Sequence, residues 1–432
     1  MEQKLKEWQK VEFSFEKKMF KGIVMPSSDK EMLRIKMASG YNAGFDMKKV
    51  SGLKVLKGTQ EVSKMKSKSV LEKEDLPLIS VLHTGGTIAS RVDYKTGAVT
   101  ANFEEGDFLT MFPKLGEIAN YNHVIIGNIL SENIRFKHHS LIAEKTFKEL
   151  NNEKVKGVII GHGTDTLHFT SAALSFMIEN PSKAVILVGS QRSSDRPSSD
   201  ASSNLEAASK FIVETNFRGI AICMHEKDDD DLFVILPANK TRKMHSSKRN
   251  AFKAINTEPL ARIDLKKNKI TFPRKESADK KMILKNKIEE KTALLKIHPN
   301  IDYEIIDYFK KSGLKGLILE GTGLGHTPGR DDDIAKGNKE FFDALEELIK
   351  SGCVVGMTTQ CLNGRVNMNV YRTGRFLQEI GVLSGEDMLP ETAFVKLAWL
   401  LGNYTKDETV KLFSQNLRGE INQRLKIEED EN

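Results

Sequence analysis

Hydrophobic and polar residues alternate through roughly the first fifty positions of the chain. Val11, Phe13 and Phe15 are separated by polar residues, which is the period of a strand that buries one face. Polar and glycine-containing turns divide this region into five such stretches, so the sequence predicts a small antiparallel β-barrel over residues 1–56. The strands are expected within residues 10–15, 20–26, 31–37, 39–45 and 50–56.

A different pattern begins at Pro77. Short runs of apolar residues end in glycine-containing or polar turns, and amphipathic stretches such as residues 140–152 and 338–352 lie between them. Strands buried on both faces that alternate with helices are typical of parallel α/β sheets. The fold class is therefore α/β, with two parallel-sheet lobes over residues 77–263 and 297–432. The runs and their turns occupy residues 78–87, 155–166, 183–192, 219–226, 314–323 and 353–360.

Two polar segments separate these units. Residues 57–76 lack apolar periodicity and are rich in Lys, Ser and Glu, which predicts a linker. Residues 264–296 contain eleven basic and five acidic residues, a local net charge of +6, with scattered apolar positions. This second segment is interpreted as an exposed basic connection between the two lobes.

Composition narrows the class of protein. The net charge of +7 over 432 residues is small for a dedicated nucleic-acid binder. The three cysteines are widely spaced without a CxxC pair, which argues against a disulfide scaffold or a cysteine zinc site and fits a reducing cytoplasm. The chain begins without an apolar signal segment and has no run of eighteen apolar residues, so a cytoplasmic location without a membrane span is expected.

Ligands of parallel α/β sheets bind beyond the carboxyl ends of the strands, so the turns there are the first candidates for chemistry. The turn HTGGTIAS (83–90) contains Gly85 and Gly86, which allow close approach of a ligand to the backbone, followed by Thr87. The plainer interpretation is a tight turn with a threonine helix cap.

The turn GHGTDT (161–166) offers Thr164 and Asp165 at the start of a predicted helix. Both are good helix caps, which is the plainer interpretation, but they also lie where helix amides stabilise negative charge. His162 has no second histidine four positions later, so a structural role is favoured over metal binding.

The third candidate is the basic stretch NKTRKMHSSKRNAF (239–252). It could be a solvated loop or face RNA; alternatively, one of its lysines turns inward to pair with Asp165. A buried lysine beside a carboxylate can serve as a base, and composition does not decide which lysine it is.

Two threonines, an aspartate and a lysine can carry out nucleophilic chemistry without histidine or metal. A threonine hydroxyl needs an adjacent base that is itself oriented by a third group, and glycine-rich turns can supply backbone donors for an oxyanion. This set suits amide hydrolysis through an acyl-enzyme. The chain has no P-loop, no GxSxG elbow, no HExxH and no convincing dinucleotide fingerprint.

TGGTIAS (84–90) and HGTDT (162–166) together resemble the two signatures of the asparaginase/glutaminase family. PETAFVKLAWLLG (390–402) is similar to the C-terminal helix of that family. The whole chain, with KGIVMP near its start and TRKMHSSKRNAF at 241–252, resembles a narrower family, the D subunits of archaeal glutamyl-tRNA(Gln) amidotransferases.

The resemblance implies roles for individual residues. Thr87 matches the nucleophile, and Thr164, Asp165 and Lys243 match the proton relay, with Lys240 as the rival to Lys243 if the loop register slips. Ser131 and Asp165 match the groups that hold the α-carboxylate and α-amine of the substrate. Tyr94 matches a tyrosine on a mobile lid. Gly86 and Gly163 would supply backbone donors, and no metal is implied.

The implied function is a glutaminase component of a tRNA-dependent ligase used in protein biosynthesis. Ammonia from glutamine would pass to a partner, the E-type subunit of the amidotransferase, which converts Glu-tRNA(Gln) to Gln-tRNA(Gln) with ATP and magnesium. The resemblance further implies a homodimer of this chain within an α2β2 heterotetramer, tRNA(Gln) bound mainly by the partner, and no cofactor in this chain. The alternatives are a free-standing L-asparaginase with an added N-terminal domain, and a scaffold without catalysis, which would need loss of the threonines or the lysine.

Overall fold

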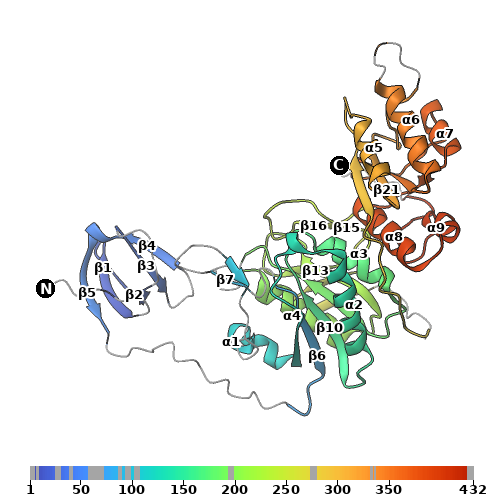
Figure 1. Ribbon diagram of the computed structural model, residues 1–432. Coiled ribbons are helices and arrows are strands. Elements are labelled where there is room, and N and C mark those ends of the chain that lie inside the picture. Colours follow the sequence, from blue (N-terminus) through green and yellow to red (C-terminus); the bar gives the residue numbers. More distant parts are fainter. Residues whose placement is uncertain are drawn as a thin grey trace, which may run out of the picture.

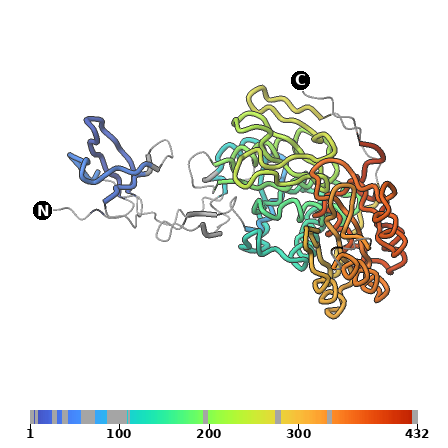
Figure 2. Tube along the Cα trace, turned by 90° about the horizontal axis from the view of Figure 1, so that it is seen from above, coloured from blue at the N-terminus to red at the C-terminus, as the bar shows by residue number. Residues whose placement is uncertain are grey.

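The structure is a computed structural model, and it is described here over most of the chain. The described residues are 5, 9–24, 31–37, 42–56, 73–85, 90–92, 99–101, 108–192, 199–272, 280–330, 334 and 337–425. Figures 1 and 2 show the chain in two views, coloured from blue at the N-terminus to red at the C-terminus.

The N-terminal unit is a five-stranded antiparallel sheet with the strand order β4-β3-β2-β1-β5. Its alternating apolar residues form one small core, in which the rings of Phe13 and Phe45 meet edge to face at 4.8 Å between centroids. The described pairings contain no β4–β5 pair that would close the barrel. The strands are β1 (Lys10–Phe15), β2 (Lys18–Val24), β3 (Met32–Met37), β4 (Asn42–Asp46) and β5 (Val50–Val55).

The first α/β lobe is built on an eight-stranded sheet with the order β18-β17-β14-β13-β12-β10-β6-β9. Its strands are β6 (Leu78–His83), β9 (Asn120–Ile125), β10 (Val155–Gly161), β12 (Ala184–Val188), β13 (Gly219–His225), β14 (Leu232–Pro237), β17 (Ala261–Asp264) and β18 (Lys269–Thr271). The five strands from β9 to β13 run parallel, as the continuous apolar runs predict. The other three extend the sheet in antiparallel fashion, so the sheet is mixed rather than wholly parallel.

Helices and loops cover both faces of this sheet. Helices α2 (Phe136–Leu150) and α3 (Leu167–Met177) contribute to one core, and α4 (Ala201–Glu214) contributes to the other together with the short elements α1 (Phe108–Met111) and η4 (Pro113–Glu117). Among the described residues, no helix combines the length and the apolar character needed to cross a bilayer.

The second lobe contains a four-stranded parallel sheet of β20 (Thr292–Lys296), β21 (Gly316–Gly321), β22 (Val354–Thr359) and β23 (Leu383–Ser384). The prediction of a parallel α/β lobe is confirmed here. Its helices are α5 (Glu304–Lys311), α6 (Gly337–Lys350), α7 (Arg372–Glu379), α8 (Pro390–Asn403) and α9 (Lys406–Phe413).

Helix α8 joins the two lobes. It packs against α3 of the first lobe and against β21 of the second, and both views show the two lobes side by side. Trp399 on α8 is buried, stacks on Phe176 of α3, and donates its indole N–H to the carbonyl oxygen of Lys285 at 2.9 Å. The second lobe is therefore packed through α8 against α3, a helix that covers one face of the first sheet.

The basic segment 264–296 is divided differently from the exposed connection that the sequence predicts. Its start forms β18 at the edge of the first sheet, where the neighbouring Phe272 packs on Phe211 and Phe217. Its end forms β20 of the second sheet, and β19 (Ile283–Leu284) between them pairs with β11 (Ile178–Glu179). The sequence does not predict these strands, because lysines are frequent in the segment and a short strand at the edge of a sheet needs only one or two buried residues.

Candidate active site

The turn that carries Thr164 and Asp165 lies between β10 and α3, at the carboxyl end of a central parallel strand. The turn after the neighbouring strand β6 is tied to it, because Thr84 donates both its backbone N–H and its hydroxyl to the Gly161 carbonyl, at 3.1 and 2.9 Å. Gly85 has a φ of +109°, and a side chain there would collide with the backbone of Ile129. Gly85 is thus required for the path of the chain into the TGGT turn.

Lys243 is the lysine that reaches this turn. It ends β15 (Thr241–Lys243), which pairs in an antiparallel hairpin with β16 (Phe252–Ala254). Its ammonium group donates to Thr164 Oγ1 at 2.8 Å and to Asp165 Oδ1 at 2.7 Å. The rival Lys240 is directed elsewhere, with its Nζ 2.6 Å from Asp387 Oδ2.

The three groups differ in their exposure to solvent. The side chain of Lys243 is 11% exposed and that of Asp165 is 63% exposed, whereas Thr164 as a residue is 7% exposed. The lysine and the threonine are therefore enclosed, while the carboxylate is exposed to solvent. The ion pair itself is partly screened by water because its acid is exposed.

Ser131 lies directly beside the same turn. It begins the short helix η5 (Ser131–Asn133), is buried, and accepts a hydrogen bond from the backbone N–H of Asp165 at 3.3 Å. The hydroxyl of Thr166 donates to the Ser131 carbonyl at 2.6 Å. Gly163 packs against the Ser131 side chain. The predicted substrate-binding pair, Ser131 and Asp165, is therefore adjacent in space although 34 residues separate them in the chain.

A chain of buried hydrogen bonds holds the backbone of the Gly163–Thr164 turn on its interior side. His162 Nδ1 donates to the Gly163 carbonyl at 2.7 Å, which leaves its Nε2 to accept from Thr170 Oγ1 at 2.9 Å. Thr170 Oγ1 then accepts from His139 Nε2 at 3.3 Å. Burial lowers the pKa of His162 to about 4 and that of His139 to about 3, so both rings are neutral near pH 7.

The sequence favours a structural role for His162, and its contacts in the structure are those of a backbone support. His139 and Thr170 were not identified from the sequence. Their i+3 and i+4 neighbours mark a buried helix face, but nothing local indicates that two helices bring them to the same histidine. Within the described parts of the chain, no group of three or more His, Cys, Asp or Glu side chains could hold a metal ion.

Three of the predicted site residues, Gly86, Thr87 and Tyr94, lie outside the described residues. Tyr94 falls in sequence between β7 (Ser90–Val92) and β8 (Val99–Ala101), which form a two-stranded antiparallel hairpin. The geometry of the nucleophile and of the lid therefore stays a prediction from the sequence.

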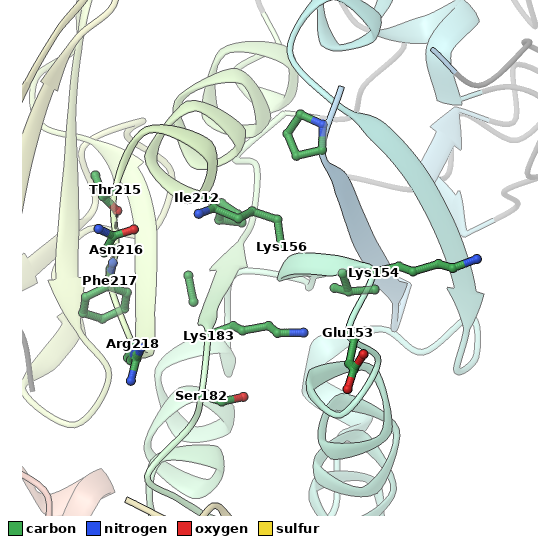
Figure 3. Close-up of a pocket in the computed structure, with 13 residues that line it drawn as sticks. Glu153, Lys154, Lys156, Ser182, Lys183, Ile212, Thr215, Asn216, Phe217 and Arg218 are labelled. Carbon is green, nitrogen blue, oxygen red and sulfur yellow. Dashed lines mark hydrogen bonds between the residues drawn. The ribbon is translucent and has the colours of Figure 1, made fainter. Parts of the chain in front are cut away.

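A cavity of about 630 Å³ lies at the amino ends of the central strands of the first sheet, where β10, β12 and β13 begin. Lys154, Lys156, Lys183 and Arg218 contribute to its lining, but Figure 3 shows Lys154 and Arg218 extending in opposite directions. The cations do not converge on a common point, and the cavity is separate from the Thr164 turn.

Comparison with known proteins supports a family assignment for the whole chain. Family models described as "Asparaginase, N-terminal" and "Glutaminase/Asparaginase C-terminal domain" match residues 78–278 and 291–413, and a model described as "GatD N-terminal domain" matches residues 5–56. A glutamyl-tRNA(Gln) amidotransferase D-type subunit from Methanococcus maripaludis is 44% identical over 424 residues, which cover 97% of this chain and 98% of the relative. The chain belongs to the family of glutamyl-tRNA(Gln) amidotransferase D subunits.

Other members and structures agree with this assignment. The D-type subunit of Thermococcus kodakarensis is 43% identical over 410 residues, which cover 93% of this chain and 90% of the relative. Among solved structures, the thermostable L-asparaginase from Thermococcus kodakarensis is 30% identical with a TM-score of 0.71, covering 80% of this chain and all of that protein. The predicted fold class is confirmed: two α/β lobes of asparaginase type follow an N-terminal antiparallel sheet.

Proposed function

We propose that this member of the family is the glutaminase component of a tRNA-dependent amidotransferase. The observation that carries the proposal is the contact of one lysine ammonium, that of Lys243, with both the Thr164 hydroxyl and the Asp165 carboxylate. The amidohydrolase role follows from this arrangement and from the asparaginase-type fold.

In the proposed reaction, the Thr87 hydroxyl attacks the side-chain amide carbon of glutamine. The C–N bond then breaks, ammonia leaves with a proton from the relay, and a glutamyl ester remains on Thr87. Water attacks this ester, and glutamate is released. Backbone N–H groups of the glycine turns that contain Gly86 and Gly163 would stabilise the oxyanion in both steps.

The relay supplies and removes the proton. Once the Lys243 ammonium has given a proton to solvent, Thr164 takes the proton from the attacking hydroxyl or water as its own proton passes to the lysine nitrogen. The Asp165 carboxylate, 2.7 Å from the lysine nitrogen, stabilises the ammonium that forms. The histidine chain makes no hydrogen bond to the side chains of Thr164, Asp165 or Lys243 in the described structure, and it holds the Gly163–Thr164 backbone in place.

The substrate is expected to bind through its charged α-groups. Asp165 pairs with the α-ammonium, while the Ser131 hydroxyl donates to the α-carboxylate. Tyr94 would close over the bound amino acid from the β7–β8 hairpin. These contacts favour an amino acid with a free backbone over a peptide, because both α-groups must be charged.

The proposed product, ammonia, is used by a partner. The E-type subunit would bind Glu-tRNA(Gln), activate its glutamyl group with ATP and magnesium, and form Gln-tRNA(Gln). This chain would form a homodimer within an α2β2 complex in the cytoplasm, and most tRNA contacts would lie on the partner. No cofactor is proposed for this chain.

The deciding experiment measures ammonia release from glutamine and from asparagine, with and without the E-type partner and Glu-tRNA(Gln). We expect glutamine hydrolysis that rises strongly when both are added. Thr87→Ala should abolish hydrolysis and leave assembly with the E-type partner unchanged. Efficient asparagine hydrolysis with no response to the partner and tRNA would instead support the free-standing asparaginase.

A further inference from the structure

The strand that carries Lys243 has two faces with different partners. Side chains alternate across a strand, so Lys243 on one side is opposed by Arg242, and by Lys240 just before the strand, on the other. The contacts follow this alternation. Lys243 reaches Thr164 and Asp165 of the first lobe, whereas Lys240 and Arg242 reach carboxylates of the second lobe.

Lys240 forms a buried ion pair with Asp387, in the loop between β23 and α8. The two side chains are 2% and 0% exposed, and Lys240 Nζ also donates to the Asp387 carbonyl at 3.2 Å. Asn422 satisfies the rest of the carboxylate, because its backbone N–H and its side-chain amide donate to the two oxygens at 2.8 and 2.9 Å. Separating the two side chains would leave a buried charge without its partner, which costs much free energy. The pair therefore keeps Lys240 and Asp387 in one relative position.

The first turn of α8 makes two more contacts with the same stretch. Glu391 Oε1 lies 3.1 Å from Arg242 Nε, and the Thr392 hydroxyl donates to the Asn239 carbonyl at 2.8 Å. Glu391 Oε1 also lies 3.9 Å from His168 Nε2 on α3, the helix that begins directly after the Asp165 turn. Side chains of the first turn of α8 therefore contact both β15, which carries Lys243, and α3, which begins directly after the Asp165 turn.

We propose that Asp387 and Glu391 of the second lobe are positioning residues that hold strand β15, and through it Lys243, against Thr164 and Asp165. This inference rests on the proposed glutaminase function. The ammonium of Lys243 must meet two partners within 2.8 Å from the end of a flexible four-carbon chain. Fixing the strand from its opposite face limits the positions that this chain can reach.

The test compares two buried lysine–carboxylate pairs of the same length. Lys396 on α8 and Glu420 form a 2.6 Å pair with both side chains 0% exposed, and no hydrogen bond or ion pair joins these two side chains to β15 in the described structure. Asp387→Asn and Glu420→Gln should lower thermal stability to a similar degree. In the assembled complex and at a temperature where both are folded, Asp387→Asn should lower the kcat for glutamine hydrolysis by roughly 10- to 100-fold with KM nearly unchanged. Glu420→Gln should keep the wild-type kcat.

Two further variants keep the test decisive if Asp387→Asn does not fold. Glu391→Gln keeps the shape of this buried side chain and removes its charge, and it should lower kcat without changing KM. Lys240→Met should have a lower kcat than the wild-type complex, whereas Lys240→Arg, which keeps the cation, should have a kcat close to that of the wild type.

A kcat for folded Asp387→Asn or Glu391→Gln equal to that of Glu420→Gln would overturn the proposal, as would equal losses for Lys240→Met and Lys240→Arg. Failure of the proposed function is distinguishable, because the wild-type complex would then release no ammonia from glutamine.

Discussion

A β-carbon added to Gly163 would stand 2.8 Å from both the Cβ and the Oγ of Ser131. Real β-carbons are not found this close to other atoms, so the glycine lets the Thr164 turn lie against the serine. The φ of Gly163 is not in the left-handed region, so the contact rather than the backbone conformation requires glycine here. The closeness of the two turns brings the Ser131 hydroxyl to the Asp165 amide.

Gly163→Ala is therefore expected to push the Ser131 and Asp165 turns apart. Overpacking of this kind costs about 1–3 kcal/mol of unfolding free energy, and the KM for glutamine should rise because the two α-group ligands lose their spacing. Denaturant unfolding and steady-state kinetics measure the two effects.

Gly116→Ala is the matched control for this substitution. A β-carbon there meets nothing closer than 3.8 Å, so its unfolding free energy should change by less than about 0.5 kcal/mol. A wild-type KM for Gly163→Ala would show that the spacing of Ser131 and Asp165 does not control substrate binding.

Removal of the Lys243 ammonium should abolish the relay without unfolding the protein. Lys243→Met is expected to lower kcat by about 100- to 10,000-fold, and Lys243→Arg should also be inactive, because a guanidinium stays protonated and cannot accept the Thr164 proton. Lys248→Met, in the exposed loop of the same hairpin, is the control and should keep the wild-type kcat. Activity in Lys243→Arg would exclude the lysine as the proton acceptor.

The choice between Lys240 and Lys243 shows what the sequence could and could not predict. Its basic composition identified the stretch 239–252, and the family resemblance matched Lys243 within it, with Lys240 as the rival. The two lysines are three positions apart, and only the contact with Asp387, 147 residues later, shows that Lys240 is the one that reaches the second lobe. A distant partner of this kind leaves no local pattern in the sequence.

The fold shows the same division between local and long-range information. The central strands of both lobes were predicted because burial on both faces makes them apolar throughout, as in Val185–Val188. The edge strand β18 was missed because Lys269 and Thr271 are exposed and only Ile270 between them is partly buried. Thr164, Asp165 and Ser131 follow strands or short turns with recognisable motifs, whereas His139 takes its role from tertiary packing.

Acid should destabilise the protein well above the pKa of its carboxyl groups. Burial lowers the pKa of His162 to about 4 and that of His139 to about 3, and a histidine in the unfolded chain has a pKa near 6.5. The unfolded state therefore binds more protons than the folded state below pH 6.5. The contribution of these rings to the free energy of unfolding is at its maximum above pH 6.5. It falls as the pH drops from 6.5 toward 4, by about 1.4 kcal/mol per pH unit for each proton taken up.

Urea unfolding between pH 8 and pH 4.5 tests this expectation. The midpoint should be flat at the alkaline end and fall below pH 6.5, and His162→Gln should reduce the slope by removing one of the titrating groups. A midpoint that does not change down to pH 5 would contradict the neutral, buried state of these rings.

The three thiols should differ sharply in reactivity. Cys361 is exposed, whereas Cys223 and Cys353 are buried, and burial raises the pKa of Cys353 to about 12 and also raises that of Cys223. The thiolate is the reactive form, so access and ionisation both protect the buried pair. The native protein at pH 8 should react with one equivalent of dithionitrobenzoate quickly, and with two more only after denaturation. Cys361→Ser should remove the fast phase, and Cys223→Ser should leave it intact. A fast phase that persists in Cys361→Ser would mean that one of the two other cysteines is accessible in the folded chain.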